Sequence, residues 1–243
     1  MAEPSILYED ESVLVLNKPA GLVVHADGKT EERTLVDWVL SRYPDLKGVG
    51  EPLALEDGQT IDRSGIVHRL DRETSGAIVI AKTSESHAFL KRQFKEREVR
   101  KVYRLFVWDE MKRERGIINR PIGKSPVDFR QWSSGRGARG ELREAITWFR
   151  VLARKNGFSY VEAQPRTGRT HQIRVHFKAI NHPVVSDMLY SPKRGRGLGF
   201  ERTALHARAV TFKLKGGKEI TVNAPYPEDF VRALQELGLP LIA

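Results

Sequence analysis

An aspartate stands in a short polar segment directly in front of an apolar run. Residues 65–76 have the sequence GIVHRLDRETSG, and the apolar residues 77–81 follow it. Arg69 and Arg72 lie beside Asp71 in the sequence and favour the ionised form of its carboxyl group. An ionised aspartate at the edge of a sheet can act as a nucleophile, a base or a metal ligand, and it can equally cap a turn.

A lysine and a tyrosine share one face of a strand expected over residues 99–108. Side chains alternate between the two faces of a strand, so Lys101, Tyr103 and Leu105 point the same way. A tyrosine in a strand usually belongs to the core. Its hydroxyl group can also serve as an acid, a base or a hydrogen-bond partner in an active site.

A third segment joins basic residues to the start of a helix. Residues 165–176 have the sequence PRTGRTHQIRVH, with Gly168 between two arginines. Glycine and basic residues at the start of a helix are typical of phosphate binding. Arg174 lies one turn beyond His171, where it could hold a buried carboxylate in a bidentate pair or lie on a basic helix surface.

Several common catalytic sites are excluded. The chain has no cysteine, which excludes disulfides, thiol nucleophiles and cysteine-bound metals. It also lacks a Gly-x-Ser-x-Gly nucleophile motif, a P-loop and a His-Glu-x-x-His zinc motif. His171 and His176 are five residues apart and do not share a helix face, so they form a poor metal pair. We therefore expect neither a metal nor a cofactor.

Charge is unevenly distributed along the 243 residues. The chain carries 41 Lys and Arg against 31 Asp and Glu, a formal net charge of +10. Residues 1–60 hold 12 acidic and 5 basic residues, whereas residues 61–243 hold 19 acidic and 36 basic residues. The excess of basic residues after residue 60 favours a polyanionic partner, because contacts to phosphates release counterions.

No apolar run approaches the roughly 20 residues that span a bilayer. The N-terminus lacks a secretory signal, so we expect an unexported protein.

The hydrophobic patterns predict short strands joined mainly by hairpins. Strands are expected over residues 13–17, 77–81, 99–108, 141–153, 158–163, 209–214 and 219–222, and helices over 35–43, from Ser84 onward, over 171–180 and over 228–237. Residues 44–60, 109–140 and 190–202 are expected as loops. Since few crossover helices are expected, the fold class is α+β, with a largely antiparallel mixed sheet and flanking helices and loops.

Together these segments resemble the RluA-like family of pseudouridine synthases. Residues 68–71, HRLD, with 74–76, TSG, are similar to the catalytic motif of that family, residues 100–103, RKVY, to its tyrosine motif, and residues 168–176 to its third motif. Smaller resemblances lie at residues 17–21, at His182-Pro183 followed by Asp187, and at residues 205–207. These motifs appear in the same order as in the family, from about residue 6 to residue 227. Residues 44–64 and 109–140 show no family pattern.

The resemblance implies a pseudouridine synthase fold in a single catalytic domain over residues 1–243, without a separate N-terminal RNA-binding domain. It implies that uridine in RNA is isomerised without metal or cofactor: the N1–C1′ bond breaks, the uracil turns, and C5 bonds to C1′. Asp71 would be the nucleophile, at the ribose or at the uracil ring. Arg174 would pair with Asp71 and keep it ionised. Tyr103 would stack against the target base and could take part in proton transfer.

RNA contacts are expected from a wider set of basic residues. Arg69 matches a family residue that fills the helix gap left by a flipped nucleotide. The full set of expected RNA-binding and base-flipping residues is Arg69, His68, Arg169, His171, Arg136, Arg139, Lys193 and Arg194. The expected partner is ribosomal or transfer RNA, and the protein is expected to be a cytoplasmic monomer.

Two other classes of function stay open. A non-catalytic RNA-binding or ribosome-assembly protein on the same fold would explain the charge equally well. It would not explain why Asp71, Tyr103 and Arg174 all match the catalytic set of the family. A nucleoside hydrolase that uses Asp71 as a base would release free uracil, which is readily detected.

Overall fold

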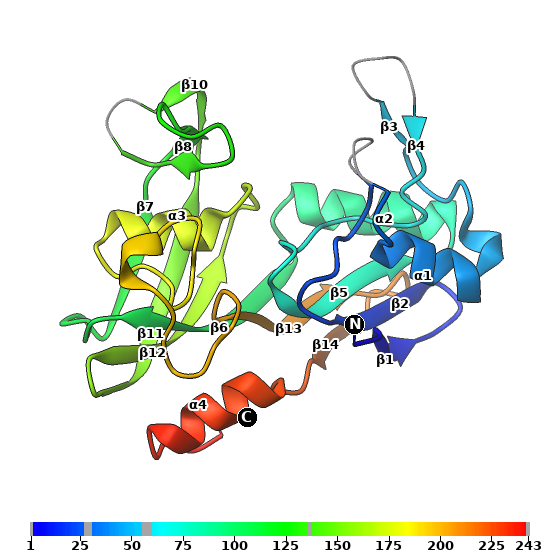
Figure 1. Cartoon of the computed structure of the whole chain (residues 1–243). Helices are drawn as coiled ribbons and strands as arrows, with labels where there is room; N and C mark the ends of the chain where they lie inside the picture. The colour runs from blue at the N-terminus through cyan, green and yellow to red at the C-terminus, as the bar shows by residue number, and fades with distance from the viewer. Residues whose placement is uncertain (1, 27–30, 55–59, 136–137, 242–243) are drawn as a thin grey trace. The chain divides into compact units, whose positions relative to one another are not determined.

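The structure is a computed structural model that describes residues 2–26, 31–54, 60–135 and 138–241 (Figure 1). The chain divides into two compact units. The first consists of Met1–Arg100 and Ala207–Pro225, and the second of Lys101–His206 and Tyr226–Ala243. Each unit buries its own cluster of apolar side chains. The prediction of one catalytic domain over residues 1–243 stays a prediction.

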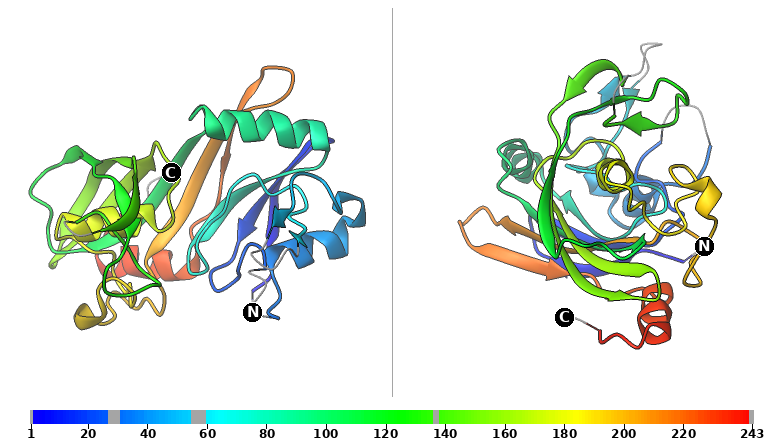
Figure 2. Two further views of the ribbon diagram at one scale, coloured as in Figure 1. Left: turned by 90° about the horizontal axis from the view of Figure 1, so that it is seen from above. Right: turned by 90° about the vertical axis from the view of Figure 1, so that its left-hand side faces the viewer.

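The first unit is built on an antiparallel arrangement of strands around β5. Its strands are β1 (Ser5–Glu9), β2 (Val13–Lys18), β5 (Ser75–Ala81), β13 (Leu205–Lys213, whose first two residues belong to the second unit) and β14 (Glu219–Asn223). They lie in the order β1-β2-β5-β13, with β14 beside β13, and β13 and β14 form the hairpin seen in Figure 2. Every residue of β5 is buried, which explains its continuous apolar sequence.

Two helices accompany these strands. In α1 (Leu35–Arg42), the side chains of Thr34 and Asp37 each bond the backbone N–H of the other, so a capping box fixes the start of the helix. In α2 (Ser84–Lys95), Leu90 packs into the same core as Val79 of β5. A 3₁₀ turn (Pro44–Leu46) and the short pair β3 (Leu53–Ala54) and β4 (Thr60–Ile61) complete the first unit.

The second unit contains two groups of strands. The larger group has the order β6-β12-β11-β7, formed by Arg100–Trp108, Phe158–Pro165, Ile146–Lys155 and Arg115–Asn119; Arg100 itself belongs to the first unit. The smaller has the order β10-β8-β9, formed by Arg139–Arg143, Ile122–Lys124 and Trp132–Ser133. The pairings of β6 with β12, β12 with β11, β11 with β7 and β8 with both its neighbours are antiparallel.

Helices α3 (Gln172–Ala179) and α4 (Glu228–Glu236) cover opposite faces of the larger group, as Figures 1 and 2 show. Phe177 of α3 contacts Phe149 of β11, with ring centroids 5.8 Å apart. On the other face, Phe230 of α4 contacts Phe106 at 5.5 Å, and Phe106 stacks on Tyr160 at 4.9 Å. This places Tyr103 and Lys101, which alternate with Phe106 along β6, on the face covered by α3.

The α+β class with a mainly antiparallel sheet is confirmed. The expected helices over 35–43, 171–180 and 228–237 are confirmed within one residue at each end, and the helix expected from Ser84 onward begins there. The hairpin at Asn156-Gly157 joins β11 to β12. No helix in the described part of the chain has the length and apolar character needed to cross a membrane.

Three sequence predictions need correction. The single strand expected over residues 141–153 is divided between β10 and β11, because the chain changes partner near Ala145, whose carbonyl accepts a hydrogen bond from Arg120 N–H. The loop expected over 109–140 contains β7, β8, β9 and the start of β10, which pair with distant segments. The loop expected over 44–60 contains a 3₁₀ turn, β3 and the first residue of β4; its residues 55–59 lie outside the described residues.

Gly76 allows β5 to lie close to β13. Its φ angle is +113°, and a Cβ atom at this position would lie 2.2 Å from the carbonyl oxygen of Ala207. Any other residue would therefore have to push the two strands apart at the end of the segment that carries Asp71.

Candidate active site

The segment that carries Asp71 is fixed through its main chain. The carbonyl of Arg72 accepts hydrogen bonds from Gly21 N–H at 2.9 Å and from Lys18 Nζ at 3.0 Å. The carbonyl of Asp71 accepts a hydrogen bond from Thr74 N–H at 3.1 Å, which closes a turn. The Asp71 side chain is half-buried. The position of this carboxylate therefore depends on backbone contacts that involve residues 18–21.

Lys18 is the buried residue that connects β2 to this turn. The residue is fully buried, and its ammonium also donates to the carbonyls of Pro19 and Leu22, at 2.8 Å each. A buried ammonium with three carbonyl acceptors satisfies the hydrogen-bonding needs of the charge and of the turn at the same time. In the sequence, Lys18 stands out only within the small family resemblance at residues 17–21, because charged residues next to turns are usually solvated.

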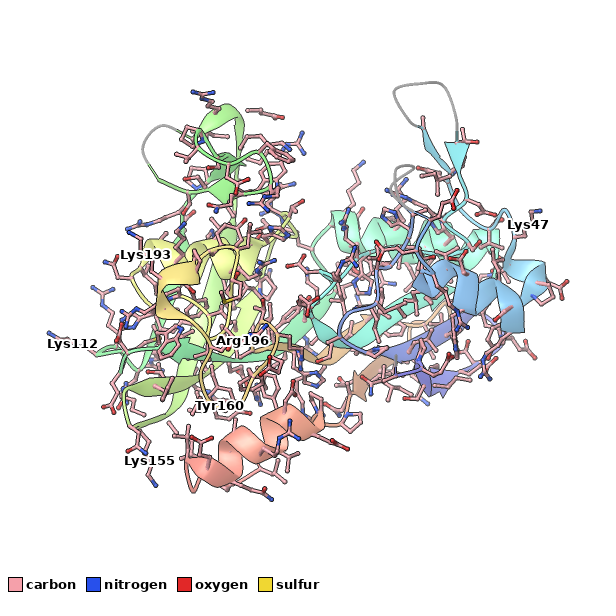
Figure 3. All side chains as sticks on the ribbon, viewed as in Figure 1. Lys47, Lys112, Lys155, Tyr160, Lys193 and Arg196 are labelled. Carbon is pink, nitrogen blue, oxygen red and sulfur yellow. The ribbon has the colours of Figure 1, made fainter. Side chains whose placement is uncertain are left out.

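Replacing Lys18 with methionine is expected to lower the free energy of unfolding by about 2–4 kcal/mol, because buried carbonyls lose their donor. Lys47→Met is the matched control, since Lys47 is exposed in the same unit (Figure 3). Urea denaturation of both variants measures the difference. Equal stability of the two variants would contradict the structural role of Lys18.

The arginines around Asp71 have different surroundings. Arg72 forms two hydrogen bonds to the carboxylate of Glu32, at 2.6 and 2.5 Å, so Glu32 neutralises its charge. Arg69 is exposed. Of the two cations expected to favour the ionised form of Asp71, Arg72 thus has a carboxylate partner of its own.

His68 has a structural position within the first unit. Its Nε2 accepts a hydrogen bond from Val79 N–H at 2.9 Å, and its ring stacks on Phe94 with centroids 4.6 Å apart. These contacts attach the segment before Asp71 to both β5 and α2. The RNA contact expected of His68 stays a prediction.

Arg63 is a basic residue of this region that no sequence motif includes. Its Nε is buried without a hydrogen-bond partner among the described residues. Burial and the positive charge of Arg69 lower the pKa of the Arg63 guanidinium. The adjacent Asp62 carboxylate accepts hydrogen bonds from the backbone N–H groups of Gly48 and Ser64 instead. Arg63 lies in a loop without family pattern, so no sequence signal distinguished it.

In the second unit, Arg174 forms a buried ion pair with Asp187. Its Nε and one terminal nitrogen donate to the two carboxylate oxygens at 2.7 and 2.9 Å. The Asp187 side chain is fully buried and the Arg174 side chain is 9 % exposed. One oxygen of Asp187 also accepts hydrogen bonds from the backbone N–H groups of Leu189 and Tyr190. The bidentate carboxylate pair foreseen as one possibility for Arg174 is thus present, and its carboxylate is Asp187.

Tyr190 extends this cluster to His171 and to the smaller group of strands. The guanidinium carbon of Arg174 lies 4.9 Å from the centroid of the Tyr190 ring. The Tyr190 hydroxyl is 2.9 Å from His171 Nδ1 and accepts a hydrogen bond from Trp132 N–H at 3.0 Å. His171 therefore has a partner within the protein, and its φ angle of +54° places it at the start of α3 in the left-handed region.

His176 is excluded as an acid or base near neutral pH. It is fully buried between Thr147 Oγ1 and the carbonyl of Arg120, at 2.9 and 3.0 Å. Burial lowers the pKa of its imidazole to about 4, so the ring is neutral at pH 7.

The remaining expected RNA contacts lie on the surface of the second unit or close to it. Arg169 donates through Nε to the carbonyl of Glu144 at 3.0 Å. Arg139 is exposed on β10, and Arg194 is exposed in a 3₁₀ turn. Lys193 is exposed in the same turn (Figure 3). Arg194 also pairs with Asp109 at 2.6 Å. Arg136 lies outside the described residues.

The predicted catalytic residues are distributed over both units. Asp71 belongs to the first, where the structure groups it with Lys18 and Gly21. Tyr103 and Arg174 belong to the second, where Tyr103 is half-buried opposite Ala163. Their catalytic roles stay predictions. The pairing partner Asp187 was noted in the sequence only as part of a small family resemblance.

Comparisons with known proteins agree with the resemblance. The sequence model of a family described as RNA pseudouridylate synthase matches residues 12–179, which include Asp71, Tyr103 and Arg174. An uncharacterized RNA pseudouridine synthase of Synechocystis sp. is 40% identical over 94% of this chain and 67% of its own length. Ribosomal large subunit pseudouridine synthase D of Xanthomonas campestris is 36% identical over 96% of this chain and 69% of its own length. The structure of human RNA pseudouridylate synthase domain containing 1 has a TM-score of 0.73 at 28% identity and covers 93% of this chain and 84% of its own.

Proposed function

Because the chain belongs to the RNA pseudouridylate synthase family, we propose that it isomerises uridine to pseudouridine in structured RNA, with Asp71 as the nucleophile. The proposal is supported chiefly by the position of Asp71. Its turn is held by Lys18 and Gly21 through the Arg72 carbonyl, within the range that the family model matches. A nucleophile needs such a fixed position more than a surface aspartate does.

The proposed reaction is balanced without any added reactant. Asp71 attacks the ribose at C1′ or the uracil ring, and the N1–C1′ bond breaks. The uracil turns, C5 bonds to C1′, and the bond to Asp71 breaks, which returns the free carboxylate. The hydrogen on C5 leaves as a proton while N1 gains one. Tyr103 stacks against the base and Arg174 holds the negative charge of Asp71, so the reaction needs all three residues at one uridine.

RNA binding in this proposal depends on positive charge and on base flipping. A uracil within a stem is inaccessible, so the enzyme must extrude it and offset a few kcal/mol of lost stacking. Arg69, exposed beside Asp71, fills the gap that the base leaves. The excess of basic residues after residue 60 supplies affinity for the phosphate backbone. Ribosomal and transfer RNA are the candidate substrates, and one relative is named for the ribosomal large subunit.

The proposal is tested by release of tritium from RNA labelled at C5 of uridine, with ribosomal and transfer RNA offered separately. Isomerisation must expel the C5 hydrogen, so release from either RNA is the expected result and names the substrate class. Salt-sensitive binding to both RNAs without release would instead favour a non-catalytic RNA-binding protein. Liberation of free uracil would favour a hydrolase.

A further inference from the structure

Lys101 is half-buried, and its ammonium group has no acidic partner among the described residues. It lies on β6 two residues before Tyr103, on the face of the strands that α3 covers. In the part of the chain that the structure describes, no ion pair or hydrogen bond includes its Nζ. Burial and the charge of Arg166 lower the pKa of Lys101 to about 8. Its ammonium form is therefore costly in the free protein, and a bound anion would stabilise it.

Arg166 is the second cation at this position. It follows β12 directly, is exposed, and has no carboxylate partner among the described residues. Its guanidinium carbon lies 5.2 Å from the centroid of the Trp148 ring, which orients the side chain. Two neighbouring cations repel each other unless an anion lies between or beside them.

Gly168 leaves space next to the ammonium of Lys101. A Cβ atom built on Gly168 would lie 4.0 Å from Lys101 Nζ, so the backbone passes close to the charge. Because glycine has no side chain, nothing from residue 168 covers that charge. Tyr103 lies two residues further along the same strand face, at a distance of roughly 7 Å along the strand.

We propose that Lys101 and Arg166, beside Gly168, bind a backbone phosphate of the substrate RNA next to the nucleotide that Tyr103 contacts. The inference rests on the proposed function, since it takes RNA as the ligand. Lysine acts on a phosphate as a compact point charge, and the arginine fork can donate two parallel hydrogen bonds. Arg174, by contrast, has an anionic partner within the protein, because two of its nitrogens donate to the Asp187 carboxylate.

The first test measures RNA affinity as a function of salt for Lys101→Met in the Asp71→Asn background, so that no turnover occurs. The RNA is the one that releases tritium in the isomerase assay. We expect about tenfold weaker binding at 0.15 M salt, and a slope of log K against log salt that is smaller by about 0.7–0.9, the value for one phosphate contact. Lys155→Met, an exposed lysine on the same unit (Figure 3), is the matched control and should keep the slope.

The same substitution should make the protein more stable. Methionine keeps the apolar stem and removes a charge that has no partner, so the melting temperature of Lys101→Met should rise. A lysine with a structural role would show the opposite change. Lys101→Arg keeps the charge and should retain the salt dependence of the wild type.

A second probe locates the phosphate. RNAs that carry one neutral methylphosphonate at successive positions around the target uridine are bound to wild type and to Lys101→Met. At one position, the loss of affinity from the methylphosphonate and the loss of affinity from Lys101→Met should not add, because both changes remove the same contact. Full additivity at every position, or an unchanged salt slope for Lys101→Met, would overturn the inference even if the protein isomerises uridine. Absence of isomerisation would instead count against the proposed function.

Discussion

Asp71→Asn should bind RNA as tightly as the wild type and release tritium from C5-labelled uridine at least about 10³-fold more slowly, the order of loss that follows removal of a nucleophile. The amide has nearly the same shape as the carboxylate but cannot form the covalent bond on which the proposed reaction depends. Single-turnover release with enzyme in excess over RNA measures the chemical step, and filter binding of the same RNA measures affinity.

This substitution should spare the main-chain contacts that hold the turn. The turn is held by the carbonyls of Asp71 and Arg72, which bond Thr74 N–H, Gly21 N–H and Lys18 Nζ, and none of these contacts uses the Asp71 side chain. Asp45→Asn, at an exposed position in the same unit, serves as the control and should keep full activity. A residual rate for Asp71→Asn within tenfold of the wild type would remove Asp71 from the nucleophile role.

Local patterns were sufficient to predict most of the elements. β5 is apolar throughout because it is buried throughout. The capping box of Thr34 and Asp37 and the hairpin at Asn156-Gly157 involve residues at most a few positions apart. Such features depend on nearest neighbours in the chain, so the sequence alone contains them.

Features that depend on distant partners were not predictable in the same way. The alternating pattern of residues 141–153 continues across the point where the chain leaves β8 and joins β7, because both sheets require the same period of two. β7 and β8 are short, and only their pairing with β11 and β10 identifies them as strands.

The candidate site also combines features that local sequence predicts with features that depend on distant partners. Asp71, Tyr103 and Arg174 could be proposed from motifs, because residue type and order suffice for that. The burial of Lys18, and of the Arg63 Nε that has no hydrogen-bond partner among the described residues, depends on which distant segments pack around them. No periodicity or spacing contains that information, and charged residues in turns are ordinarily solvated.

The pair of Arg174 and Asp187 should dominate the stability of the second unit. Removal of one partner leaves a buried charge unpaired, so Arg174→Ala is expected to lower the free energy of unfolding by about 3–5 kcal/mol. The matched control is Arg194→Ala, because Arg194 makes a similar bidentate pair with Asp109 on the surface, where about 1 kcal/mol or less is expected. Chemical denaturation of both variants measures the contrast. Equal stability and equal isomerase activity for the two would refute it.

A double variant separates the structural role of Arg174 from its proposed catalytic role. Arg174→Met with Asp187→Leu removes both charges, so part of the stability lost in Arg174→Ala should return. The recovery should be incomplete, because the backbone N–H groups of Leu189 and Tyr190 also lose their acceptor on Asp187. Isomerase activity should stay at the level of Arg174→Ala, since the proposed mechanism needs the guanidinium beside the charge of Asp71. If activity returned together with stability, Arg174 would be a structural residue only, and the proposed pairing of Arg174 with Asp71 would be wrong.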